Sequence, residues 1–469
     1  MKNISFLVFG FLSLVAHAQT AWSLQDCISY ALNHSISLKQ SALNNEIKQN
    51  NVVQSKAGVL PNFNLGANHI YNYGKTVDRF TNTFADTKVL SQNFFLNGQV
   101  VLWGGLSQYN NIKANEYNYL SGVELLKQQE YDLSLNVANA YIGVIFSEEI
   151  LKISQSQFQI TKEQLERTQK LVNAGALAKS IEYDIKAQLA SEEVNVTSAD
   201  NNFALAILSL KQLMNFDSIS NFSVARPDIV ISESQLAENN LTSIYETSLK
   251  NQPSIKSGEY SILSSERSLA ANRGKRSPTL SLVGTLATGT SGLAKDVLGV
   301  NYVGYKVAGI TSKGDSVYVP LTESITQVTP FYDQFRNNVS KSFGFQLSIP
   351  IYNGLQTHTA VKNAKINAFN TKLSLDLTKQ NLYKNIAQAS ANAKAAFNKY
   401  MATRSSVEAA SMSFEYAQEK FNAGVISAFD FNTAKNRLYA AESNLLQSKY
   451  DYVFKLKVLD YYQGIPLGF

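Results

Sequence analysis

Residue types that commonly do chemistry are few in this chain, and they lie far apart. The histidines are His17, His34, His69 and His358, and the single cysteine is Cys27. These residues do not form a catalytic or zinc-binding pattern, because such sites need His, Cys or carboxylate side chains at short, defined spacings. No Gly-x-Ser-x-Gly segment, P-loop or dinucleotide fingerprint occurs in its required context. We therefore expect a protein that is not an enzyme and that has no metal or other cofactor.

The charge and the cysteine content argue against two further classes, nucleic-acid-binding proteins and disulfide-stabilised folds. The net charge of +6 is small for 469 residues, and no run of Lys and Arg with interleaved aromatics indicates a nucleic-acid partner. One cysteine cannot form an internal disulfide, so Cys27 is expected to be a small buried hydrophobic residue.

Residues 1–18 have the pattern of a secretory signal peptide, with Lys2 before the apolar stretch Ile4–Ala16 and a small-residue cleavage site ending at Ala18. A mature chain beginning at Gln19 is expected, and an uncleaved N-terminal helix is the alternative. No later stretch approaches the roughly 20 apolar residues of a transmembrane helix. Entry into a membrane would therefore require β-strands closed into a barrel, since lipid offers no hydrogen bonds to an open strand edge.

The sequence contains an internal duplication, in which one structural unit occurs twice in tandem. Asn173-Ala174-Gly175 recurs as Asn422-Ala423-Gly424, at an offset of 249 residues. Nearer the start of each unit the offset is 217, as between Ala31–Lys39 and Ser248–Lys256. The difference between 249 and 217 leaves 32 additional residues in the second unit. We place them in a Gly- and Ser-rich stretch at 290–339, which we expect to be a long loop.

Each unit is expected to run helix, strand, loop, strand, long helix, turn, helix. The first repeat covers 19–243, with strands at 61–73 and 93–103, helices at 106–172 and 178–214, and a linker at 215–243. The second repeat covers 244–469, with strands at 278–290 and 342–352 and helices at 355–421 and 427–463.

The long helices are the unusual part of each unit. Leu355–Ala423 contains neither Gly nor Pro, and Leu106–Asn173 contains no Pro. At about 1.5 Å per residue, such a helix is on the order of 100 Å long. Apolar side chains recur along the second long helix in steps of four and three, at Leu382, Ile386, Ala389, Ala393, Ala396 and Tyr400. This spacing predicts a coiled-coil seam, and the polar remainder suits the wall of a water-filled tube.

All four predicted strands alternate apolar and polar side chains. In 61–73, Phe63 and Leu65 fall on one face, and Asn62 and Asn64 fall on the other. The strand lengths suit a tilted transmembrane β-strand, which needs about 9–11 residues. Aromatic residues that favour the membrane interface stand at strand ends: Tyr71, Tyr73, Trp103 and Tyr352. A half-buried soluble sheet is the alternative.

Four strands cannot close a barrel, since about eight is the practical minimum. Two copies of the chain would supply eight strands, and three copies would supply twelve. A wide lumen that continues into a helical tube favours three.

With these features the chain resembles the TolC-like outer-membrane efflux family. The resemblance covers nearly the whole mature chain. It rests on the duplicated unit, the long helices, the paired stretches Ala31–Lys39 and Ser248–Lys256, and the Asn-Ala-Gly turns. It implies an α+β membrane protein of two tandem repeats. Three copies would form a 12-stranded β-barrel in the outer membrane of a two-membrane bacterial envelope, continuing into a 12-helix periplasmic α-barrel.

The resemblance also implies a function. The chain would be the exit duct of a tripartite efflux or type I secretion system, passing small molecules or polypeptides to the exterior. Its expected partners are its own copies, a periplasmic adaptor (membrane fusion) protein, an inner-membrane pump and outer-membrane lipid. The helix tips that would contact the adaptor carry Asn173, Gly175, Asn422 and Gly424.

In members of this family, the pore is narrowest at acidic residues just after the second tip turn. Asp430 matches the first of these positions. The second position falls at Thr433, which departs from the usual acid. In the first repeat the equivalent of Thr433 is Asp184, with Glu182 nearby. We expect Asp430 and Asp184 to form acidic rings at a closed entrance, which would favour cations. Ordinary solvated helix charges are the alternative.

A soluble periplasmic coiled-coil adaptor or scaffold is the main rival function, and an envelope enzyme is a weaker one. An adaptor would carry one helical hairpin and a compact β-rich domain, rather than two copies of alternating strands. Drug, metal and polypeptide cargo stay open, and no Met or His cluster favours metal.

Overall fold

The structure, a computed structural model, describes residues 21–86, 88–217, 222–227 and 240–468. The expected signal peptide and much of the expected linker at 215–243 lie outside the described residues. The chain divides into two compact units. The helical unit comprises Met1–Lys48, Tyr117–Ile262 and Asn370–Phe469, and the sheet unit comprises Gln49–Glu116 and Leu263–Phe369.

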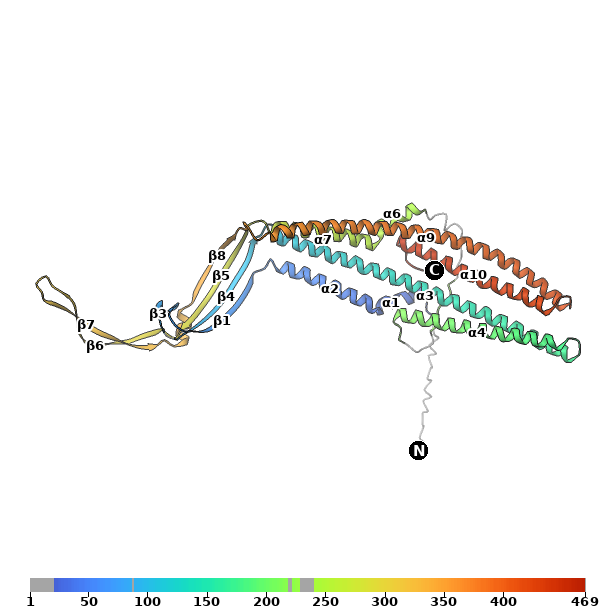
Figure 1. The fold of residues 1–469 in the computed structure, drawn as a ribbon, viewed down its shortest axis with the longest axis horizontal. Coiled ribbons are helices and arrows are strands. Elements are labelled where there is room, and N and C mark those ends of the chain that lie inside the picture. The colour runs from blue at the N-terminus through green and yellow to red at the C-terminus, as the bar shows by residue number, and fades with distance from the viewer. Residues whose placement is uncertain (1–20, 87, 218–221, 228–239, 469) are drawn as a thin grey trace, which may run out of the picture. The chain divides into compact units, whose positions relative to one another are not determined.

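The helices of the two repeats correspond in order and in length (Figure 1). The first repeat contains α1 (Leu24–His34), α2 (Ile36–Ala57), α3 (Ser107–Asn173) and α4 (Lys179–Met214). The second contains α6 (Leu241–Asn251), α7 (Pro253–Gly274), α9 (Gln356–Asn422) and α10 (Ala428–Gln463). Both α3 and α9 have 67 residues, and both α4 and α10 have 36. The bounds of these four helices lie within one residue of those expected from the sequence.

The main sheet draws two strands from each repeat. It consists of β1 (Asn62–Asn72), β4 (Val89–Trp103), β5 (Thr279–Ser291) and β8 (Ser340–Ser348), in the antiparallel order β1-β4-β5-β8. A small hairpin of β2 (Thr76–Asp78) and β3 (Thr83–Ala85) lies between β1 and β4 in the sequence. β8 ends at Ser348, short of the expected 352, because Pro350 has no N–H to donate to a sheet.

The cross-strand register sorts the side chains of the sheet into two faces. One face is apolar and carries Phe63, Leu65, Phe94, Leu96, Val100, Leu280, Leu282, Leu286, Phe343, Phe345 and Leu347. The other face carries Asn62, Asn64, Asn93, Asn97, Gln99, Ser281, Thr285, Ser342 and Gln346. Many of the apolar side chains are exposed. A contiguous exposed apolar surface of this kind marks a binding or membrane surface.

The stretch 290–339, expected to be a long loop, is structured instead. It contains β6 (Lys295–Ile310), β7 (Ser316–Val328) and the short helix α8 (Phe331–Asn337). β6 and β7 pair with each other as a separate two-stranded hairpin, beyond the end of the main sheet at which β5 ends (Figure 1). The expectation was wrong because the glycines that suggested a loop occupy regular positions in a strand.

Those glycines mark bulges at a constant spacing. The pairing of β6 with β7 shifts immediately before Gly299, Gly304 and Gly309, so that 16 residues of β6 face 13 of β7. Each shift adds one unopposed residue, and bulges of this kind increase the twist of a strand pair. The hairpin is therefore built from five-residue segments of β6 that each face about four residues of β7.

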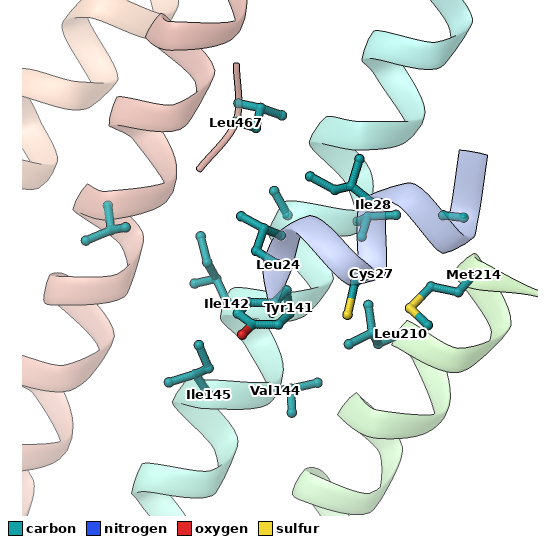
Figure 2. Packing of buried hydrophobic residues seen from close by; sticks show 14 of the residues in the cluster. Leu24, Cys27, Ile28, Tyr141, Ile142, Val144, Ile145, Leu210, Met214 and Leu467 are labelled. Atoms are coloured by element: carbon teal, nitrogen blue, oxygen red, sulfur yellow. The ribbon is translucent and has the colours of Figure 1, made fainter. Parts of the chain in front are cut away.

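The largest hydrophobic core belongs to the helical unit (Figure 2). It brings Leu24, Cys27 and Ile28 of α1 against Tyr141 of α3 and Leu210 of α4. Cys27 is fully buried, as expected, and burial raises the pKa of its thiol to about 12. The thiol is therefore protonated at neutral pH and acts as a small apolar group. No helix among the described residues combines the length and the apolar character that a membrane crossing requires.

Candidate functional site

The turns that join α3 to α4 and α9 to α10 share one backbone conformation. Gly175 and Gly424 have φ angles of +77° and +74°, and they follow the helix ends Asn173 and Asn422 by two residues. In both turns the N–H after the glycine donates to a carbonyl five residues earlier, from Ala176 to Leu171 (2.9 Å) and from Val425 to Lys420 (2.8 Å). This is a Schellman end, whose left-handed residue favours glycine. Both glycines therefore terminate the long helices.

The helices that follow these turns begin differently. The Ser427 hydroxyl accepts from the Asp430 N–H (3.2 Å), and the Ser427 backbone N–H donates to the Asp430 carboxylate (3.4 Å), which together form a capping box for α10. The Ser427 hydroxyl also donates to the same carboxylate (2.7 Å). At the equivalent position α4 begins after Ala178, with no side-chain cap. A capping side chain stabilises a helix by about 1 kcal/mol. Asp430 is exposed, yet its carboxylate also secures the start of α10.

The other expected entrance residues lie on the first turns of the same two helices. Asp184 is exposed on α4. Glu182 accepts from Lys186 (2.7 Å), and this hydrogen bond holds the pKa of Glu182 below its usual value. The Thr433 hydroxyl donates to the carbonyl of Phe429, one turn earlier in α10 (2.8 Å). Within one chain, Glu182, Asp430 and Thr433 thus have local partners.

One contact joins the tips of the two repeats. The guanidinium of Arg167, near the end of α3, donates to the side-chain oxygen of Asn422 at the end of α9 (2.7 Å). Asn422 was expected only as a tip residue, and the structure shows that it also connects the repeats.

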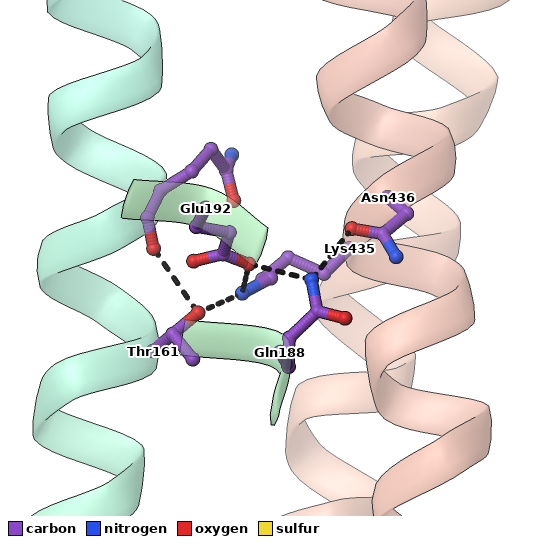
Figure 3. A network of polar contacts seen from close by, with 6 residues as sticks. Thr161, Gln188, Glu192, Lys435 and Asn436 are labelled. Atoms are coloured by element: carbon purple, nitrogen blue, oxygen red, sulfur yellow. Dashed lines mark hydrogen bonds and ion pairs between the residues drawn. The ribbon is translucent and has the colours of Figure 1, made fainter. Parts of the chain in front are cut away.

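A second, buried connection between the repeats was not expected from the sequence (Figure 3). The Lys435 side chain of α10 is 1% exposed, and its ammonium lies 2.7 Å from the Glu192 carboxylate of α4, which is 6% exposed. The same ammonium donates to the Thr161 hydroxyl of α3, and Gln188 donates to the same Glu192 oxygen (2.8 Å). Burial lowers the pKa of Lys435, and the contact with Glu192 opposes that shift.

This network belongs to a polar seam along α3. Buried side chains recur in steps of three and four at Ser154, Gln157, Thr161, Gln164 and Thr168. In the middle of the same helix the seam is apolar, with Val137, Tyr141, Val144 and Leu151 buried. Buried polar groups need hydrogen-bond partners, and among the described residues both amide atoms of Gln164 and one oxygen of Glu192 lack one. Toward the tip, the helix packing is therefore polar and incompletely satisfied.

With the fold and these contacts in place, the chain can be compared with known proteins. Residues 27–215 and 244–460 match the family described as "Outer membrane efflux protein". The chain belongs to this family. Outer membrane protein TolC of Escherichia coli K12 is 23% identical over 465 residues, which cover 97% of this chain and 84% of TolC. The outer membrane efflux protein BepC of Brucella suis is 21% identical over 360 residues, covering 75% and 68%.

Solved structures of outer-membrane channels share the fold. CusC superimposes with a TM-score of 0.74 at 16% identity, covering 94% of this chain and 92% of CusC. The open state of the Neisseria gonorrhoeae channel MtrE gives a TM-score of 0.71 at 17% identity, covering 94% and 89%. This outer membrane efflux protein is therefore an exit duct that extends from the outer membrane into the periplasm. The expected TolC-like family is confirmed.

In an efflux duct, the helix tips and the polar seam near them form the candidate functional site. The sequence located the tips because Asn-Ala-Gly recurs at one offset. It missed the seam because Ser, Thr and Gln at core spacing look like surface residues on a helix that is mostly polar. The polar seam could have been recognised because its residues continue, beyond Leu151, the steps of three and four residues that the buried apolar side chains of α3 follow.

Proposed function

We propose that three copies of this chain assemble into a closed duct. Three main sheets would form a 12-stranded β-barrel in the outer membrane, and three sets of α3, α4, α9 and α10 would form a 12-helix periplasmic tube. The main sheet carries this proposal. Its outer strands, β1 and β8, each pair with one neighbour among the described residues. In lipid, the remaining strand edges need partners, which further copies supply.

The two faces of the sheet support the same assembly. Closing the sheets with the apolar face outward would place Phe345 and Leu347 toward lipid, and Asn64 and Gln346 toward the lumen. Tyr71, Tyr73, Trp103 and Tyr352 are exposed near the strand ends, where we propose that they lie at the membrane interfaces. The ammonium of Lys88 lies 4.1 Å from the ring centroid of Tyr71, and this places a cation beside one of them.

The duct would pass small molecules or polypeptides received from an inner-membrane pump. A periplasmic adaptor would contact the tips at Asn173, Gly175, Asn422 and Gly424. Support comes from the exposure of both turns and from the family, whose channels work with such partners. The pump, not the duct, would supply the energy for transport.

At the entrance, Asp430 and Asp184 would form acidic rings, with Glu182 and Thr433 beside them. All four positions lie within the first turns of α4 and α10, next to the tips. Rings of carboxylates attract cations, so the closed entrance should be cation-selective. Because Lys186 pairs with Glu182, we expect the two aspartates to carry most of the effect.

The experiment that tests the assembly is a mass measurement. The chain is expressed with its own N-terminal segment, extracted from membranes in mild detergent, and its protein mass is measured by light scattering. We expect a trimer that appears only after extraction and that conducts ions in a planar lipid bilayer. A monomer or dimer recovered without detergent would leave too few strands for a barrel and would restore the soluble scaffold as the better function.

A further inference from the structure

The turn between β2 and β3 is fixed to one end of the main sheet. This is the end at which β1 and β5 finish, whereas α2 and α7 precede these strands at the opposite end. The Asp78 carboxylate of β2 accepts from the hydroxyl of Ser291, the last residue of β5, and from the hydroxyl of Thr81 in the turn (2.6 Å each). Asp78 is 2% exposed. This buried, hydrogen-bonded carboxylate holds the turn against β5.

The turn lies on the polar face of the sheet. Gly289 of β5 pairs with Asn93 of β4 and shares this face with Thr285, four residues earlier in β5. A Cβ atom on Gly289 would overlap the ring of Phe80, so this ring covers the glycine from the polar side. Arg79 precedes Phe80 in the turn and is exposed. Both residues line a hollow of about 480 Å³ over the polar face, together with Asn93 and Thr285.

The other charges of this segment do not cancel Arg79 at the turn. The adjacent acid, Asp78, is buried, and its carboxylate is bound by hydroxyl groups. Lys75 and Asp86 are exposed and of opposite sign, and they flank the β2–β3 pair at its end away from the turn. The guanidinium of Arg79 is therefore the exposed charge that the turn carries over the polar face.

We propose that Arg79 lines the pore, and that three copies of it form a cationic ring at the exterior mouth of the duct. The inference rests on the proposed function, because it requires three sheets closed with their polar face inward. The helices extend into the periplasm, so the opposite end of the sheet, which carries the turn, faces the exterior. Rings of Arg or Lys side chains favour anions. The mouth would therefore attract anionic solutes, in contrast to the acidic rings at the periplasmic entrance.

The decisive variant neutralises the ring. The Debye length is about 30 Å at about 0.01 M salt and about 3 Å at about 1 M, so the charge of Arg79 reaches across the mouth only at low salt. We expect Arg79→Gln to raise the K⁺/Cl⁻ permeability ratio of the bilayer-reconstituted duct about twofold at low salt and to leave it unchanged at high salt. The reversal potential in a salt gradient measures this ratio.

The matched control removes a cation from the other face of the sheet at the same end. The ammonium of Lys88 lies 4.1 Å from the ring centroid of Tyr71, which shares the apolar face of β1 with Leu65. Lys88→Gln should leave the permeability ratio unchanged. Equal shifts in Lys88→Gln and Arg79→Gln would overturn the ring, because the charge would then act without lining the lumen.

A second measurement uses the wild-type duct and stands alone if Arg79→Gln fails to assemble. Inorganic triphosphate added on the exterior side should lower the conductance reversibly at about 0.01 M salt, and about 1 M salt should abolish this effect. An unchanged permeability ratio in a conducting Arg79→Gln trimer would overturn the ring while leaving the proposed duct in place. If that variant does not assemble, a wild-type conductance that triphosphate leaves unchanged would overturn the ring. Recovery of the chain without detergent would overturn both proposals.

Discussion

Lys186 and Lys435 occupy equivalent positions in the two repeats, 249 residues apart, but their surroundings differ. Lys186 is 45% exposed and pairs with Glu182 one turn away on its own helix. Lys435 is 1% exposed and pairs with Glu192 of the other repeat. The position equivalent to Glu192 in the second repeat is Ala441, so only one of the two lysines has this buried partner. The duplication thus preserved the helices, while the contact between the copies became specific to one lysine.

The same contrast has an energetic side. An exposed pair one helical turn apart contributes about 0.3–0.5 kcal/mol. Removing one partner of a buried pair costs about 3–5 kcal/mol, because the other charge stays buried without compensation. The same substitution should therefore lower the free energy of unfolding much more at Lys435 than at Lys186.

The largest effect is expected from Lys435→Met. It leaves the Glu192 carboxylate buried beside Thr161, and we expect the free energy of unfolding to fall by about 3–5 kcal/mol. The matched control is Lys186→Met, for which we expect little or no change in the free energy of unfolding, because solvent screens the exposed pair of Lys186 and Glu182. Denaturant unfolding of the detergent-solubilised protein measures both. Equal losses would show that the two lysines are energetically alike despite their burial.

The second prediction removes both charges of the buried pair. In Lys435→Met with Glu192→Leu, no uncompensated charge remains, so most of the stability lost in the single variant should return. Double-mutant analysis of the same unfolding data gives the coupling between the two positions. A double variant as unstable as Lys435→Met would mean that packing, and not charge, dominates at this place.

The helix starts provide a smaller comparison. Ser427→Ala removes the cap of α10 and should lower the stability by about 1 kcal/mol. Ala178→Ser should raise it by a few tenths of a kcal/mol to about 1 kcal/mol, because residue 178 already has the extended backbone of a cap (φ −74°, ψ 143°). Thermal unfolding measures both. If Ala178→Ser destabilised the protein, the missing side-chain cap would not be the only structural difference between the start of α4 and the start of α10.

The smallest structural change is expected from Asp430→Asn combined with Asp184→Asn. Removing these carboxylates should shift the reversal potential of the bilayer-reconstituted duct toward weaker cation selectivity. Because Asp430 also completes the cap, Ser427→Ala serves as the control that disturbs the cap and keeps the charge. Unchanged selectivity in the double variant would show that these residues are ordinary solvated charges.

Much of the fold followed from the sequence, for identifiable reasons. Continuous helix between Leu355 and Ala423 was visible because no Gly or Pro interrupts it, and the ends were visible because Gly424 must adopt a left-handed conformation. The two faces of β1 were visible because Phe63 and Leu65 alternate with asparagines.

The site was only partly visible, also for physical reasons. Lys435 and Glu192 are 243 residues apart, and neither carries a local sign that it will be buried. The polar seam was hidden because hydrophobicity is the main signal of burial, and Gln157 and Gln164 lack it. The β6–β7 hairpin was hidden because Gly299, Gly304 and Gly309 break the two-residue alternation by which strands are recognised.

That hairpin has a consequence for how its length can vary between related genes. Tyr302–Lys306 of β6 faces Val319–Thr322 of β7, so nine residues form one interchangeable module. Deleting both segments together would join flanking residues that already have the correct pairing and the correct face. The hairpin would shorten by about 13 Å, four residues of strand, with every remaining side chain on its original side. Insertions or deletions in this region are therefore expected to come in paired blocks of five and four codons.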